Sequence, residues 1–92
     1  MKLNSHEIGL LINAGTYERC YLFPGYDGYE VFFMAGDEEG GCRQDHLTTN
    51  AGTVKTYSSV DRALVAIRAL GWQMSVIIET PTGGIKGEVS AV

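Results

Sequence analysis

Four side chains in this sequence have the chemistry of nucleophiles, bases or soft metal ligands: Cys20, Cys42, His6 and His46. Nucleophilic catalysis needs a nucleophile within hydrogen-bond reach of a base. Cys42 and His46 are four positions apart, but in an extended strand this spacing separates their Cα atoms by about 13 Å. Because the two side chains would not touch, the sequence predicts no catalytic residue and a protein that is not an enzyme.

The same four residues do not form a metal site. Structural zinc is usually held by four thiolate or imidazole ligands that occur as close pairs, and the sequence contains no CxxC or HxxxH pair. The acidic stretch 37–39 does not follow the alternating ligand pattern of a calcium loop. Its carboxylates would also repel phosphate from the glycine-rich segment 36–41. We therefore expect no metal and no cofactor.

The charge balance disfavours nucleic acid as a partner. Seven lysines and arginines stand against eleven aspartates and glutamates, which gives a net charge of −4. Proteins that bind nucleic acid through its phosphates need a clustered basic surface instead. One local patch is compatible with an alternative function as a nucleic-acid-associated regulator, and it consists of Lys55, Arg62 and Arg68.

No segment has the pattern of a signal peptide or a membrane span. The first residues lack a long apolar stretch, and no run approaches the roughly 18 apolar residues that a membrane helix requires. We therefore expect a cytoplasmic protein without a membrane partner. Cys20 and Cys42 would stay reduced there, and we interpret both as small buried hydrophobic residues.

Two helices are indicated by their caps and apolar spacing. Asn4 and Glu7 have the form of a capping box, which predicts a helix over residues 5–14. Ser58 and Ser59 can cap a second helix, with Asp61 placed to complete a box with Ser58. Apolar residues then recur at helical spacing up to residue 70. Gly71 follows as the expected left-handed C-cap.

Strand-like segments fill the space between and after these helices. Residues 19–23 and 29–34 flank a turn-forming segment and predict a β-hairpin, and further strands are expected over residues 42–48, 53–57 and 74–79. The sequence therefore predicts an α+β fold, an antiparallel β-meander of four to five strands with two helices in the order α-β-β-β-β-α-β. We expect one domain over residues 1–82 and a flexible C-terminal tail over residues 83–92.

The hairpin is apolar on both of its faces. Val31 and Phe33 point to one side of their strand, and Phe32 and Met34 point to the other. The second face could be covered by the helix at residues 5–14, or by another protein chain, most simply an identical one in a two-fold dimer. It could also form a small-ligand groove. We assign the protein interface to Phe32, Met34 and Leu22, and the aromatic walls of a groove to Tyr26, Tyr29 and Trp72.

One segment resembles a known family. Residues 54–64, VKTYSSVDRAL, continued by IRALG at residues 67–71, are similar to a pattern in small plasmid-borne accessory proteins called ParC-like, which are encoded beside partition genes. In that family a strand, a serine–aspartate cap and an amphipathic helix ending in Leu-Gly lead into a last strand. The resemblance implies a non-enzymatic accessory factor of plasmid or mobile-element maintenance, and it implies no functional residue.

Overall fold

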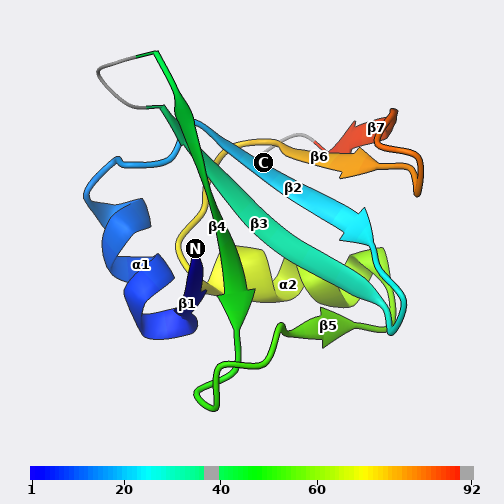
Figure 1. Ribbon diagram of the computed structural model, residues 1–92, viewed down its shortest axis with the longest axis horizontal. Coiled ribbons are helices and arrows are strands. Elements are labelled where there is room, and N and C mark those ends of the chain that lie inside the picture. The colour runs from blue at the N-terminus through cyan, green and yellow to red at the C-terminus, as the bar shows by residue number, and fades with distance from the viewer. Residues whose placement is uncertain (37–39, 90–92) are drawn as a thin grey trace.

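The computed structural model describes residues 1–36 and 40–89. The acidic residues 37–39 of the glycine-rich segment and the last three residues of the chain, 90–92, lie outside this part. In chain order the elements (Figure 1) are β1 (Lys2–Asn4), α1 (Ser5–Asn13), β2 (Arg19–Pro24), β3 (Tyr29–Gly36), β4 (Cys42–Thr48), β5 (Thr56–Tyr57), α2 (Val60–Ala69), β6 (Val76–Glu79) and β7 (Ile85–Val89).

The strands form one mixed sheet in the order β1-β4-β3-β2-β6-β7, and β5 pairs separately with β3. β1 is parallel to β4 and β2 is parallel to β6, while the remaining neighbours are antiparallel. The expected α+β class with two helices is confirmed. The expected antiparallel meander is wrong, because the sheet is mixed, has seven strands and includes β1 and β7, which the sequence analysis does not predict.

Most of the segment expected to be a flexible tail is part of the sheet. β7 pairs antiparallel with β6, with Val89 beside Val76 and Glu88 beside Ile77. The turn between the two strands is closed by a 2.8 Å hydrogen bond from the Thr80 amide to the Gly84 carbonyl. The expectation of an unstructured tail is therefore wrong for residues 85–89.

The helix ends follow the local sequence signals. Asn4 and Glu7 form the predicted capping box, since the Asn4 side chain accepts from the Glu7 amide at 2.9 Å and the Glu7 carboxylate accepts from the Asn4 amide at 3.1 Å. In α2 the N-cap is Ser59 rather than Ser58, and its hydroxyl accepts from the Arg62 amide at 3.2 Å. Gly71 has a φ of 102° and so provides the predicted left-handed turn after α2.

Both helices pack on the same face of the sheet. Ile8 of α1 and Ile67 of α2 are fully buried in one cluster with side chains of the strands, Cys20, Leu22, Val31, Phe33, Leu47 and Val76. Figure 1 shows α2 passing behind β3 and β4, with no helix in front of these strands. The expectation that helix 5–14 covers the second face of the hairpin is therefore wrong. Within residues 1–36 and 40–89, no helix lies across that face.

A glycine fixes the turn between β2 and β3. Gly28 has a φ of 142°, and a Cβ atom added there would lie 2.7 Å from the backbone oxygen of Tyr57 in β5. We expect Gly28→Ala to lower the free energy of unfolding by at least about 1 kcal/mol more than Gly52→Ala, because Gly52 also has positive φ but open space around it. Urea denaturation of the two variants measures the difference. Equal losses would show that the contact with β5 does not constrain the turn.

Candidate interaction surface

The face of the sheet opposite the helices carries ring side chains across three neighbouring strands. Tyr21 of β2 is paired with Phe32 of β3, and Phe32 is paired with His46 of β4. The Tyr21 and Phe32 rings lie 4.9 Å apart at an angle of 9°, and the Phe32 and His46 rings lie 5.4 Å apart. These separations are favourable for ring pairs. We call Tyr21, Phe32 and His46 the aromatic row, and the face that carries them the open face.

Side chains two positions from the aromatic row share its face, because alternate residues of a strand point to the same side. The strand register places two groups on opposite sides of the row. One group, the basic end, consists of Arg19, Met34 and Gln44. The other group, the acidic end, consists of Phe23, Glu30 and Glu79. The open face is therefore aromatic along its middle, with a guanidinium on one side and two carboxylates on the other.

A shallow hollow of about 290 Å³ lies over the acidic end and extends across the aromatic row to Gln44. Its lining comes from four strands and includes both carboxylates as well as two rings of the aromatic row: Phe23, Glu30, Phe32, Gln44, His46 and Glu79. Partial burial raises the pKa of Glu79 by desolvation. A cation placed over this hollow would therefore meet an aromatic floor and two negative charges, which is a favourable setting for a guanidinium or an ammonium group.

Phe32 is only 9% exposed although no described helix covers it, because the rings of Tyr21 and His46 pack on either side of it. Burial lowers the pKa of His46, and the nearby terminal amino group adds to this effect. His46 is therefore neutral near pH 7 and its ring acts as a largely apolar neighbour of Phe32. The aromatic row thus presents a flat, uncharged strip.

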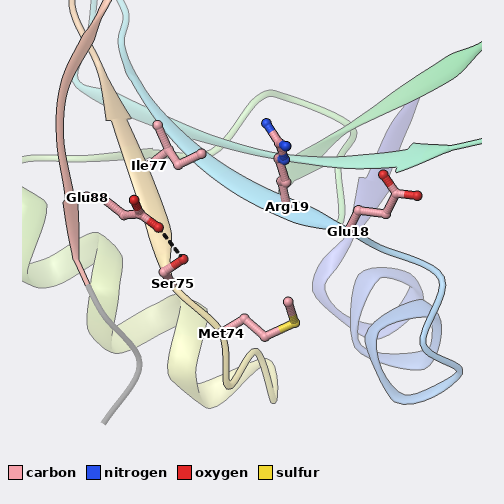
Figure 2. A pocket seen from close by; sticks show the side chains of 6 residues that line it. All are labelled: Glu18, Arg19, Met74, Ser75, Ile77 and Glu88. Atoms are coloured by element: carbon pink, nitrogen blue, oxygen red, sulfur yellow. Dashed lines mark hydrogen bonds between the residues drawn. The ribbon is translucent and has the colours of Figure 1, made fainter.

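A second hollow, of about 330 Å³, lies beside the basic end and is lined by Glu18, Arg19, Met74, Ser75, Ile77 and Glu88. Figure 2 shows the Ser75 hydroxyl bonded to the Glu88 carboxylate, a contact of 2.6 Å, with Ile77 above them. Ile77 is paired with Tyr21 and Glu88 is paired with Ile77. This hollow therefore continues the open face toward β7 and belongs to the same surface.

The sequence-based interface residues divide between the two faces of the sheet. Phe32 lies in the aromatic row, and Met34 lies at the basic end two positions away, where the strand alternation places it. Leu22 is wrong as an interface residue because it is fully buried in the core beneath the helices. Tyr21 and His46 are not identifiable as interface residues from the sequence, because only the register of β2 and β4 against β3 shows that they flank Phe32.

The three residues of the nucleic-acid alternative have different surroundings. The Arg68 guanidinium donates to the carbonyls of Trp72 and Met74 at 3.0 and 2.7 Å and so holds the connection between α2 and β6. The Lys55 ammonium lies 5.8 Å from the centre of the Tyr57 ring. Arg62 is exposed in the first turn of α2. Two of the three charges are thus engaged in contacts within the chain.

The proposed aromatic groove and the reactive residues are also dispersed. Trp72 is buried against Phe33, so it cannot form a groove wall with Tyr26, which is exposed in the β2–β3 turn.

Burial raises the pKa of the Cys20 thiol, as expected for a core cysteine. Cys42 is exposed, so the expectation that it is buried is wrong. Among the described residues, no group of three or more histidines, cysteines and acids is placed to hold a metal ion.

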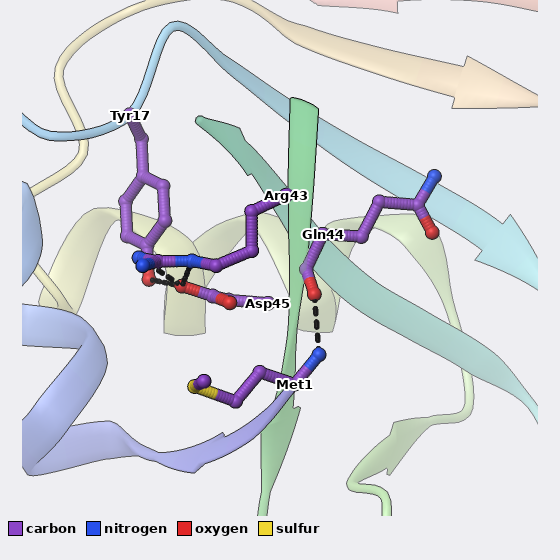
Figure 3. A network of polar contacts seen from close by, with 5 residues as sticks. All are labelled: Met1, Tyr17, Arg43, Gln44 and Asp45. Atoms are coloured by element: carbon purple, nitrogen blue, oxygen red, sulfur yellow. Dashed lines mark hydrogen bonds and ion pairs between the residues drawn. The ribbon is translucent and has the colours of Figure 1, made fainter. Parts of the chain in front are cut away.

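One polar network lies inside the core, on the helix side of β4. Asp45 is fully buried, and its Oδ2 atom accepts from the Tyr17 hydroxyl at 2.6 Å and from Arg43 Nε and Nη2 at 3.1 and 2.8 Å. Figure 3 shows the Tyr17 ring reaching down to Asp45 from the connection between α1 and β2, with Gln44 pointing to the other side of β4. The network therefore ties that connection to the sheet and is separate from the open face.

Two further findings bear on the class of protein. No helix in the described ranges is long and apolar enough to span a membrane. No protein-family model, curated protein or solved structure matches the chain.

Proposed function

We propose that this protein is a non-enzymatic interaction module that binds a second copy of itself through the open face of its sheet. The observation that supports this proposal is the aromatic row, which crosses three strands without cover from the described helices. An aromatic strip that no described helix covers, with charged groups toward its periphery, has the arrangement of a protein–protein interface. Two sheets that pack face to face would bury it as the inner layer of a β-sandwich.

The charge distribution favours an identical chain over nucleic acid as the partner. Nucleic acid would bring phosphates to a face with carboxylates from Glu30 and Glu79, on a protein whose net charge is −4. A second copy brings its own Arg19 as well as its own acids, so opposite charges can be matched across a two-fold axis. The open face therefore suits self-association better than phosphate binding.

The biological setting that we propose follows from the resemblance of residues 54–71 to ParC-like accessory proteins. In this setting the dimer is a cytoplasmic accessory factor in the maintenance of a plasmid or another mobile element. Partition or transfer genes beside its coding sequence would support the setting. The proposal of self-association does not depend on it.

Sedimentation equilibrium over a range of protein concentrations tests the proposed self-association. We expect the average mass to rise from that of one chain, 10.0 kDa, toward twice this value and then to stay constant, because a two-fold interface closes at two copies. Dissociation by dilution should be reversible. A strict monomer at the highest concentration, with no partner recovered in pull-downs, would contradict the proposed function.

A further inference from the structure

The basic end and the acidic end of the open face lie at equal distances from the aromatic row, on opposite sides of it. On β2, Arg19 and Phe23 each lie two positions from Tyr21. On β3, Met34 and Glu30 each lie two positions from Phe32. Both ends are therefore about 7 Å from the aromatic row along the strands. A two-fold axis that runs along the row would place the basic end of one copy over the acidic end of the other.

We propose that the hollow at the acidic end receives the Arg19 guanidinium of a second copy, so that the dimer is held by two such contacts around the stacked aromatic rows. This inference rests on the proposed self-association. In the arrangement described, Arg19 comes to lie opposite the partner's Phe23, with the partner's Glu30 and Glu79 on either side. A guanidinium can stack on the ring and donate to both carboxylates at once.

The hollow has the size and chemistry for this group. It encloses about 290 Å³ above Phe23 and Phe32, and it is open enough to admit a side chain from above. Desolvation raises the pKa of Glu79, so an approaching positive charge would relieve an existing cost. Arg19 is exposed on its own chain, where its guanidinium interacts with the Tyr21 hydroxyl and lies near Glu18 and Glu88. In the dimer it would exchange these exposed contacts for the partner's Glu30 and Glu79 without unpacking the core.

A different two-fold axis, parallel to the strands, gives a different pairing. It would place Lys2 of β1, which is paired with His46 of β4, near the partner's Glu88 of β7 at the opposite edge of the sheet. It would also bring the acidic ends of the two copies together, with Glu30 beside the partner's Glu30 near the middle of the interface. Like charges are most costly where water is excluded, so the first axis is favoured.

Charge reversal distinguishes the two axes. We expect Arg19→Glu alone and Glu79→Arg alone each to raise the dissociation constant of the dimer about tenfold or more, because each places like charges opposite one another twice. An equimolar mixture of the two variants should form a heterodimer with a dissociation constant close to that of the wild type, since every reversed charge then meets an opposite one. Sedimentation velocity of the separate and mixed proteins measures this.

The matched control is Arg62→Glu, which makes the same change in charge as Arg19→Glu at an exposed position of α2, on the helix side of the sheet. We expect this variant to dimerise like the wild type. Single variants of Arg19 and Glu79 that dimerise like the wild type would overturn the proposed Arg19 contact, as would a mixture of the two that associates no more tightly than the separate variants. These results would leave self-association intact, whereas a monomeric wild type would overturn both proposals.

Discussion

Phe32→Asp is expected to convert the dimer into a monomer, with the dissociation constant raised by roughly three orders of magnitude. Phe32 is already 9% exposed in the single chain, so the loss comes mainly from the new carboxylate, whose desolvation at the centre of an interface costs about 2 kcal/mol or more, and a two-fold dimer contains two copies of this residue. The sum of about 4 kcal/mol corresponds to a factor of roughly a thousand. Sedimentation equilibrium of the variant, at the concentrations used for the wild type, measures the effect.

The control for this change is Val65→Asp on α2, where the side chain is 72% exposed on the opposite side of the molecule. Valine and aspartate have similar helix propensities, so this variant should remain folded and dimerise like the wild type. Far-ultraviolet circular dichroism shows whether Phe32→Asp keeps its secondary structure, and Phe32→Ala provides a milder test that should still weaken the dimer at least tenfold. A Phe32 variant that folds and dimerises normally would exclude the aromatic row as the interface.

The parts of the fold that depend on local signals could be predicted from the sequence. The capping box of Asn4 and Glu7 and the left-handed turn at Gly71 are fixed by residues within a few positions of each other, and both were predicted. β1 and β7 could not be predicted in the same way, because each is recognisable as a strand only from its pairing with another strand, β4 and β6 respectively. β1 has three residues, too few to show a periodicity, and β7 has a mostly exposed sequence whose partner is β6.

The candidate surface could be predicted only in part for the same reason. Alternation along β3 separates Phe32 and Met34 from Val31 and Phe33, so it identifies two residues of the open face. It does not tell which of the two faces the helices cover, and this ambiguity allowed Leu22 to be assigned to the interface. The positions of Tyr21 and His46 beside Phe32 depend on strand register, which is set by the whole sheet rather than by any one segment.

The stability of the domain is expected to depend strongly on the buried hydroxyl of Tyr17. Tyr17→Phe should lower the free energy of unfolding by about 2–3 kcal/mol, because the hydroxyl donates at 2.6 Å to a carboxylate oxygen of Asp45 that water does not reach. Burial and hydrogen bonding to Asp45 both raise the pKa of Tyr17, so the hydroxyl keeps its proton and acts as a donor at neutral pH. For a domain of this size the loss corresponds to a fall in Tm of roughly 10–20 °C.

The two carboxylate oxygens of Asp45 differ in their hydrogen bonding. Among the described residues its buried Oδ1 atom has no hydrogen-bond partner, whereas Oδ2 accepts from three donor atoms of Tyr17 and Arg43. If the Tyr17 hydroxyl is removed, solvent does not take its place because Asp45 is fully buried. The carboxylate is then left with the Arg43 contact alone. A buried charge that loses one of its hydrogen-bond donors is costly in a protein interior.

Thermal unfolding of a four-variant set tests this account. Tyr26→Phe removes the hydroxyl of a fully exposed tyrosine and should leave Tm unchanged. In an Asp45→Asn background the additional effect of Tyr17→Phe should be about half as large, since a hydrogen bond to a neutral acceptor is roughly half as strong as one to a charged acceptor. If Tyr17→Phe costs the same with aspartate and with asparagine at position 45, the charge of Asp45 plays no part in the attachment of the α1–β2 connection to the sheet. If Tyr17→Phe leaves Tm unchanged in the wild-type background, the ring rather than the hydroxyl holds that connection.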